Sequence, residues 1–386
     1  MVIYIHIPFC KKKCDYCDFL SAPADDETIE RYVVSLLREI GYHGSKYGKK
    51  GEDRNIKTIF FGGGTPSILN VNQIEAIMNK LKDEFNIEET AEITMECNPG
   101  TADKNKLMAM KNNGINRLSI GLQSADNDEL KGIGRIHTYE EFLYIFSVAR
   151  ECGFKNINVD LMSALPHQTY DSYRATLEKI VKLHPEHISA YSLILEEGTP
   201  LFDRIEAFNK EGKPNGLPDE DEEREMYYMT KEILEDNGYE RYEISNYSLK
   251  NYECRHNIAY WVREDYIGMG LGAASCIDNV RMKNISSLKE YIELKSSESY
   301  LDKAETEVLS EEDKMAEFMF LGLRLTSGIS TKEFEKQFGK NFDTIYGSIT
   351  QKHIEDGLLE KNGENIRLTE LGRDVCNVVM SSYILC

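Results

Sequence analysis

Residues 9–19 read FCKKKCDYCDF and place Cys10, Cys14 and Cys17 in the spacing CxxxCxxC. Three thiolates in so short a loop can bind a metal centre, because thiolates are ligands of both structural zinc and iron–sulfur clusters. Structural zinc takes four ligands, and the nearest further donor, His6, lies within a predicted strand. A [4Fe–4S] cluster on three cysteines instead leaves one iron open to an exchangeable ligand. The spacing favours the cluster and leaves zinc as the alternative.

Around this loop, short apolar runs typical of β-strands alternate with segments of helical apolar spacing. The predicted strands are residues 2–7, 56–61, 91–96, 117–121, 157–161 and 188–193, and the clearest predicted helices are residues 27–42, 72–85, 139–152 and 172–183. Repeated strand–helix units indicate an α/β fold with a parallel sheet and right-handed crossovers. Because there are six such units rather than the eight of a closed barrel, we expect an incomplete (β/α)6 barrel.

Turn residues and polar side chains follow the predicted strands at their carboxyl ends. The sequence GGGTP at residues 62–66 follows the second strand, CNPG at 97–100 follows the third, and GLQS at 121–124 follows the fourth. Parallel sheets bind ligands at the carboxyl ends of their strands. The cysteine loop opens on the same rim, so we expect a single ligand site there.

The chain is predicted to have three parts. Residues 1–238 form the partial barrel, residues 239–310 an irregular extension, and residues 311–386 a small winged-helix-like domain with a hairpin within 357–369. Winged-helix modules often bind DNA, but this one carries 13 Asp and Glu against 9 Lys and Arg, and the whole chain has a net charge of −20. Such charge repels a phosphate backbone, so we expect no nucleic-acid partner.

The sequence predicts a cytoplasmic protein that is not integral to a membrane. It has no apolar run of about 18 residues, and its start, MVIYIHIPFC, lacks the charged first segment and long apolar stretch of a secretory signal. Nine cysteines is an odd number, which argues against a disulfide framework. The cysteines outside the loop are expected to be small, mostly buried hydrophobic residues: Cys97, Cys152, Cys254, Cys276, Cys376 and Cys386.

The cysteine loop and the GGGTP turn together resemble the radical S-adenosylmethionine (radical SAM) family, whose CxxxCxxC signature follows the first strand of a partial (β/α)6 barrel. The resemblance implies a [4Fe–4S] cluster on Cys10, Cys14 and Cys17, with the amino and carboxylate groups of S-adenosylmethionine on the open iron. Within this family the chain resembles the oxygen-independent coproporphyrinogen oxidase group over nearly its full length. The stretches that carry this likeness include YIHIPFC, FFGGGTPS, ECNPGT, NRLSIGLQS, VDLMSALPHQT and GYERYEISNYS.

The resemblance also implies an S-adenosylmethionine site, whereas no catalytic residue is assigned. The residues at the matching positions are Tyr4, Tyr16, Gly63, Gly64, Thr65, Glu96, Gln123, Arg135 and Asp160. Glycines let a backbone approach a small zwitterion closely. Glu96 and Asp160 can hold ribose hydroxyls or an ammonium group, and Arg135 can hold a carboxylate.

Two alternatives follow from this group, a heme chaperone and a coproporphyrinogen III dehydrogenase. The oxidases typically carry a fourth cysteine two residues after the third, where this chain has Phe19, and they have an N-terminal extension before the loop. The sequence HNIAYW fits the HNxxYW motif of the chaperones, which implies heme contacts at His256, Tyr260 and Trp261. The dehydrogenase, a radical enzyme acting on propionate side chains, is the competing hypothesis. A radical enzyme with another substrate is a third, because a fold does not fix a function.

The chaperone hypothesis implies heme as a ligand and a membrane hemoprotein as a recipient. Imidazole is a common axial ligand of heme iron, and the aromatic side chains of Tyr260 and Trp261 can stack on a porphyrin. Cys254 is a rival ligand, and a buried aromatic cluster with a hydrogen-bonded His256 is the structural alternative. Ala274 occupies a position where relatives often have a histidine.

Overall fold

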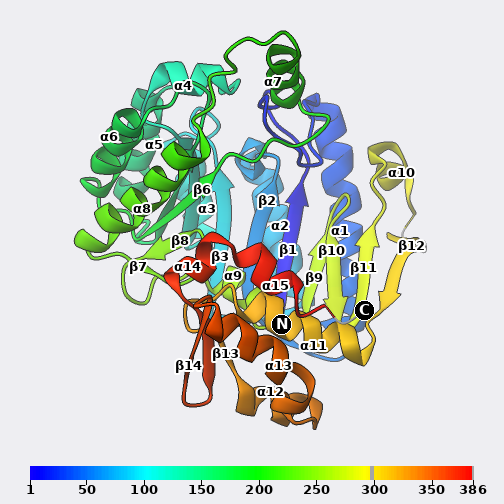
Figure 1. The fold of residues 1–386 in the computed structure, drawn as a ribbon. Coiled ribbons are helices and arrows are strands. Elements are labelled where there is room, and N and C mark those ends of the chain that lie inside the picture. The colour runs from blue at the N-terminus through cyan, green and yellow to red at the C-terminus, as the bar shows by residue number, and fades with distance from the viewer. Residues whose placement is uncertain (296–299, 385–386) are drawn as a thin grey trace.

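The computed structural model describes residues 1–295 and 300–384, and its centre is a partial barrel of parallel strands (Figure 1). The strands are β1 (Val2–Ile7), β2 (Asn55–Gly63), β3 (Asn86–Cys97), β4 (Arg117–Gln123), β5 (Ile157–Ser163) and β6 (His187–Ser192). Each pairs in parallel with the next along the chain. The sequence prediction of a partial (β/α)6 barrel is therefore confirmed.

Helices follow the strands, and most of them bury their apolar faces in the same core as the sheet. They are α1 (Asp26–Tyr47), the 3-10 turn η1 (Pro66–Ile68), α2 (Val71–Glu84), α3 (Lys104–Asn112), α4 (Asn127–Gly132), α5 (Tyr139–Glu151), α6 (Tyr170–Val181), α7 (Pro200–Lys210) and α8 (Glu220–Asp236). Reciprocal capping fixes several starts, as at α5, where Thr138 accepts from the Glu141 amide and Glu141 accepts from that of Thr138.

The extension after α8 adds strands to both edges of the sheet. Its elements are β7 (Glu240–Arg241), β8 (Asn246–Ser248), α9 (Arg255–Trp261), β9 (Tyr266–Met269), β10 (Ala274–Ile277), β11 (Val280–Asn284), α10 (Leu288–Glu293) and β12 (Leu301–Val308). The strand order is β12-β11-β10-β9-β1-β2-β3-β4-β5-β6-β8-β7. The segment that reads as irregular in the sequence thus contains short strands, and β12 and β7 stay unpaired with each other within the described ranges.

The C-terminal part has its own hydrophobic core, as expected for a small separate domain. It comprises α11 (Glu311–Gly322), β13 (Ile329–Ser330), α12 (Thr331–Phe338), α13 (Phe342–Glu355), β14 (Leu359–Asn362), β15 (Asn365–Leu368), α14 (Glu370–Asp374) and α15 (Cys376–Ser381). The predicted hairpin is confirmed as the antiparallel pair β14 and β15. The exact boundaries of the three predicted parts stay predictions.

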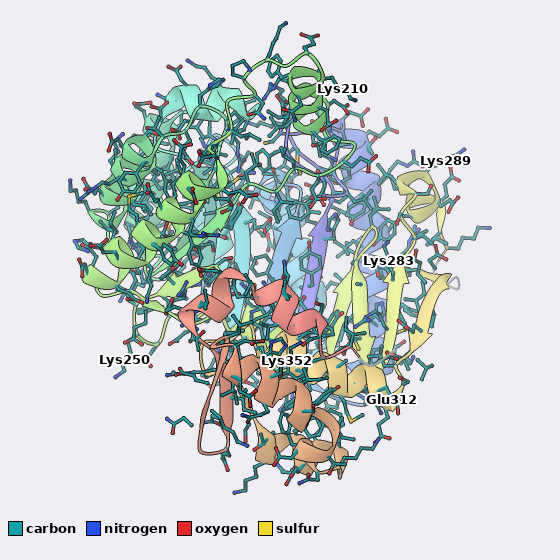
Figure 2. The ribbon with its side chains drawn as sticks, in the orientation of Figure 1. Lys210, Lys250, Lys283, Lys289, Glu312 and Lys352 are labelled. Atoms are coloured by element: carbon teal, nitrogen blue, oxygen red, sulfur yellow. The ribbon has the colours of Figure 1, made fainter. Side chains whose placement is uncertain are left out.

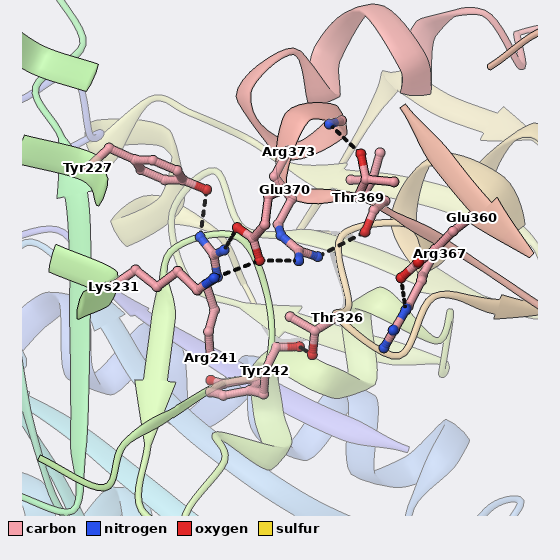
Figure 3. A network of polar contacts seen from close by, with 12 residues as sticks. Tyr227, Lys231, Arg241, Tyr242, Thr326, Glu360, Arg367, Thr369, Glu370 and Arg373 are labelled. Atoms are coloured by element: carbon pink, nitrogen blue, oxygen red, sulfur yellow. Dashed lines mark hydrogen bonds and ion pairs between the residues drawn. The ribbon is translucent and has the colours of Figure 1, made fainter. Parts of the chain in front are cut away.

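The C-terminal part packs near the amino ends of the barrel strands, opposite the loop end where α7 lies (Figure 1). Glu370 joins the C-terminal part to the rest of the molecule by forming ion pairs with Arg241 at 2.6 Å and with Lys231 at 2.9 Å (Figure 3). It also pairs with Arg373 of its own helix at 2.7 Å. These cations lower the pKa of Glu370 to about 2, although partial burial of the carboxyl opposes the shift.

The outer surface carries many charged side chains, in keeping with the composition. Figure 2 shows Lys210, Lys250 and Lys289 extending from the periphery of the molecule. Across the part of the chain that the structure describes, none of the helices combines the length and the apolar character needed to cross a membrane.

Candidate functional site

A cavity of about 560 Å³ opens at the carboxyl ends of the barrel strands, and we call it the cysteine cavity because Cys10, Cys14 and Cys17 line it. It also contains eight of the nine residues predicted for S-adenosylmethionine: Tyr16, Gly63, Gly64, Thr65, Glu96, Gln123, Arg135 and Asp160. Side chains from four successive strands and their loops therefore converge on one site. Tyr4, the ninth, lies in a second cavity described below.

The cysteine loop is held against the barrel at its start. Residues Phe9 and Ala22 form a bridge, in which the Cys10 amide donates to the Ala22 carbonyl at 3.2 Å. The Thr65 hydroxyl donates to the Cys10 sulfur at 3.6 Å, which ties the loop to the glycine turn. Cys10 is buried, whereas Cys14 and Cys17 are partly exposed to the cavity. Burial raises the pKa of the Cys17 thiol, and coordination to a metal centre would favour its thiolate form.

The arrangement of the three thiols is compatible with a cluster. Within the described residues, no three His, Cys, Asp or Glu side chains converge as ligands of one metal ion. A cubane differs, because its cysteines each bind a separate iron and need not converge on one point. His6 is not a spare fourth ligand: its Nε2 donates to the Leu20 carbonyl at 2.9 Å, and its Nδ1 accepts from the Tyr4 hydroxyl at 3.0 Å.

The glycine turn lies directly beside the loop. The Gly64 amide donates to the Ile7 carbonyl at 2.9 Å, and a Cβ on Gly64 would lie 2.6 Å from the Phe9 carbonyl oxygen. Gly63 has a φ of +109°, and a Cβ there would lie 2.4 Å from the His6 ring. Only glycine fits both positions, so the turn can present backbone groups to the cavity at close range.

Partly buried charged groups line the rest of the cavity. Asp160 accepts from Asn158 at 2.7 Å and from Ser119 at 3.3 Å, and burial raises its pKa despite these bonds. Arg135 donates to Asn98 at 3.3 Å, and its buried Nε has no partner in the described part of the chain. Two acidic groups for a cationic ligand, an arginine with a free donor for a carboxylate, and the glycine turn together fit S-adenosylmethionine.

A second, aromatic cavity of about 370 Å³ adjoins the cysteine cavity. Its lining is Tyr4, Phe60, His256, Asn257, Tyr260, Tyr266 and Ala274. His256 is buried at the start of α9, stacks on Phe60 with ring centroids 5.1 Å apart, and has both ring nitrogens engaged. Nδ1 lies 2.7 Å from the Thr58 hydroxyl and Nε2 lies 3.1 Å from the Tyr260 hydroxyl. Burial, followed by the charge of Arg117, lowers the pKa of His256 to about 3, so the ring is neutral.

The structure does not bring every predicted heme residue into this cavity. Trp261 does not line the cavity. The guanidinium carbon of Arg324 lies over its ring, 4.4 Å from the ring centroid. Cys254 is buried and donates to Glu92. Phe19 is 62% exposed at the mouth of the cysteine cavity.

Several cavity residues were missed by sequence reasoning, chiefly Arg117, Ser119, Asn158 and Ser189. They lie inside strands, whereas the sequence predicts a ligand site at the carboxyl ends of the strands. A signal was present: the strand RLSIGLQ is polar at every second position, which marks a polar inner face.

Comparisons with known proteins agree with this geometry. A sequence model described as the Radical SAM superfamily matches residues 4–180, and one described as the HemN C-terminal domain matches residues 309–375. The solved structure of the coproporphyrinogen III oxidase HemN from Escherichia coli superposes with a TM-score of 0.84 over 99% of this chain and 89% of that chain, at 24% identity. Fold and cysteine loop thus define a radical SAM protein, a class that implies a [4Fe–4S] cluster and S-adenosylmethionine.

Relatives with similar sequences identify a family within this class. The heme chaperone HemW of Lactococcus lactis is 35% identical over 99% of this chain and 97% of its own length, and that of Bacillus subtilis is 35% identical over 99% and 98%. The HemW protein of Escherichia coli is 32% identical over 99% and 97%. The chain belongs to the family of the HemW proteins.

The affinity for S-adenosylmethionine is expected to rise with pH as Glu96 loses its proton. Burial, and then the charge of Asp160, raise the pKa of Glu96 to about 8. A cationic ligand group favours the carboxylate, so binding below that pH releases a proton and the affinity rises by up to roughly tenfold per pH unit. Calorimetric titrations from about pH 6 to about pH 9 measure this slope, which should level off above the pKa.

Glu96→Gln is the matched control for this titration, because it removes the proton and preserves the size of the side chain. Its affinity should lack the part of the slope that Glu96 contributes, and an identical slope in both proteins would contradict the assignment. In the ligand-free protein, the same carboxyl has the opposite effect on a different quantity, because it lowers the stability of the fold as the pH rises. The folded state holds a proton that the unfolded carboxyl releases near its ordinary pKa of 4.5, so this group makes the fold less stable as the pH rises from there towards 8.

Proposed function

We propose that this chain is a heme chaperone, which binds heme beside a [4Fe–4S] cluster and S-adenosylmethionine and delivers the heme to membrane hemoproteins. The HemW relatives are named heme chaperones, which supports heme as the cargo. The observation that carries the proposal is the aromatic cavity, which shares Phe60 and Asn257 with the cysteine cavity. A flat apolar ligand with polar edges suits this combination of aromatic walls and an adjoining polar cavity.

In this proposal Cys10, Cys14 and Cys17 hold the cluster, and the glycine turn, Glu96 and Arg135 orient S-adenosylmethionine. The bound cofactors would supply one-electron chemistry at the rim of the barrel. Glu96 and Asp160, which line the cavity, would bind cationic and hydroxyl groups of the ligand.

His256 Nε2 is the proposed iron ligand. The Thr58 hydroxyl can accept from Nδ1–H, which leaves Nε2 as the nitrogen with a free lone pair. A fixed partner on the other ring nitrogen is the usual arrangement for a metal-bound histidine. Tyr260, whose hydroxyl now contacts Nε2, would have to move aside and could then stack on the porphyrin.

Different effects on heme affinity are therefore expected for two variants. His256→Ala should weaken hemin binding by at least roughly tenfold, since loss even of an outer-shell partner costs that much. Tyr260→Phe keeps the ring but removes the hydroxyl that competes for Nε2, so it should bind hemin at least as tightly as the parent. Titration followed in the Soret band measures both. Unchanged affinity and an unchanged spectrum in His256→Ala would exclude this ligand.

The competing function, coproporphyrinogen III dehydrogenase, is tested by turnover. After anaerobic reconstitution, the protein receives reductant, S-adenosylmethionine and coproporphyrinogen III, with the HemN oxidase of Escherichia coli as the positive control. The chaperone proposal expects no protoporphyrinogen while the control is active and four irons remain bound. Formation of protoporphyrinogen at a rate comparable to the control would refute the proposal.

A further inference from the structure

The polar face of β4 extends the cysteine cavity far below the predicted cluster. Arg117, Ser119, Gly121 and Gln123 alternate along the strand and all line this cavity. Gln123 is at the carboxyl end near the cysteine loop and Arg117 is at the amino end, about 20 Å away at roughly 3.3 Å per residue. The cavity therefore has a floor, distinct from its rim, and Arg117 lies in that floor.

Arg117 is buried with an unpartnered donor. Arg117 has only 2% exposure, and its buried Nε has no hydrogen-bond partner among the described residues. The carboxyl groups that interact electrostatically with Arg117, those of Glu92 and Asp160, already accept hydrogen bonds from other groups. Glu92 accepts from the His256 amide at 3.2 Å, and Asp160 accepts from Asn158 at 2.7 Å. A buried arginine with free donors is costly unless a ligand satisfies them.

Other polar atoms in the same region also lack partners. Thr94 pairs with Arg117 in the sheet register, and its buried hydroxyl oxygen is unpartnered. Asn246 lines the cavity opposite Ser189, and its amide oxygen is likewise buried without a partner. Arg117 and Asn246 therefore present polar atoms without partners in the lining of the cavity, whereas buried polar groups are nearly always satisfied.

We propose that Arg117 anchors a carboxylate in the floor of the cysteine cavity, and that this carboxylate is a propionate side chain of the bound porphyrin. This inference rests on the proposed heme-binding function. A guanidinium binds a carboxylate through two parallel hydrogen bonds, which fits a donor with no protein partner. Asn257, which lines both cavities, connects the floor region with the cavity of His256. Porphyrin bound by the aromatic cavity could therefore reach the floor with an acidic edge.

The test compares hemin with hemin dimethyl ester, in which both carboxylates are blocked, on the parent protein and on Arg117→Met. The parent should bind hemin roughly 10-fold to 100-fold more tightly than the ester, as expected for a charged hydrogen-bonded contact. Arg117→Met should lose most of that preference through weaker hemin binding, with ester binding unchanged. Arg174→Met, at an exposed position on α6, is the matched control and should behave as the parent. A preference that survives in Arg117→Met would overturn the inference.

Two further outcomes separate this inference from the function on which it rests. If the parent binds neither compound, the heme proposal itself fails and takes the anchor with it. If the parent binds hemin but Arg117→Met loses affinity for S-adenosylmethionine and keeps its hemin preference, the carboxylate belongs to that cofactor and the inference fails.

Arg117→Lys provides a second variant if the methionine variant misfolds. Lysine keeps the positive charge but lacks the planar fork, so it should retain only part of the preference for hemin over its ester. A full preference in Arg117→Lys would contradict paired hydrogen bonding to a propionate.

Discussion

Cys14→Ser is expected to abolish cluster binding, so that iron after anaerobic reconstitution falls from about four per chain to well below one. The cluster has three protein ligands, and serine at one position leaves only two thiolates in the loop. His6 cannot replace the lost ligand, because Leu20 and Tyr4 occupy both of its ring nitrogens. Iron and sulfide analysis, together with the charge-transfer absorbance of the cluster, measure the loss.

Cys376→Ser is the matched control for this experiment, because Cys376 is a partly exposed free thiol of the C-terminal part. It should reconstitute as fully as the parent. Four irons retained in Cys14→Ser would refute the cluster assignment, and equal losses in both variants would point to general damage by thiol removal. A single tightly bound zinc ion in the parent would instead favour the alternative that the spacing leaves open.

Glu39→Ala is expected to cause the largest loss of stability, a decrease of roughly 3–5 kcal/mol in the free energy of unfolding. Glu39 has 0% exposure in the middle of α1. Its carboxylate accepts hydrogen bonds from the Gly270 amide at 2.8 Å and from the side chains of Asn284 and Tyr291. Alanine would leave these donors buried without an acceptor, and each unsatisfied donor carries its full desolvation cost.

Chemical denaturation followed by circular dichroism measures the effect of Glu39→Ala. Glu178→Ala removes an exposed glutamate of α6 that pairs with Arg174, and it should change stability by no more than about 1 kcal/mol. Equal stability of the two variants would show that Glu39 does not hold the extension to the barrel. Because Gly270 lies in the turn between β9 and β10, loss of this contact should also loosen the wall of the aromatic cavity that contains Ala274.

The barrel strands could be predicted from sequence because they are buried and follow one another along the chain. The first predicted strand, residues 2–7, has the bounds of β1, and the other predicted strands fall within a few residues of β2 to β6. The strands of the extension escaped prediction because they are short. β7 has two residues and β8 three, and β9 pairs with β1 across more than half of the chain. Tertiary pairing rather than local pattern creates such strands.

The residues of the candidate site likewise include some that could be predicted from sequence and some that could not. Cys10, Cys14 and Cys17, and the glycine turn, could be found because their residue types and spacing are unusual in any other setting. The alternation in RLSIGLQ could have placed Arg117 on the inner face of its strand, but only the structure shows that its Nε has no partner. The sequence also left His256 between a heme ligand and a hydrogen-bonded core residue. The ligand-free structure has the hydrogen bonds of the second, and the proposal requires one of them to open.

Titration of the reconstituted protein with hemin tests the central claim most directly. The account predicts saturable binding of about one heme per chain, as expected of a single built cavity, with a Soret spectrum that changes in His256→Ala. Hemin that binds without saturation, or with the same weak affinity as to an unrelated acidic protein, would contradict the claim that this chain carries heme.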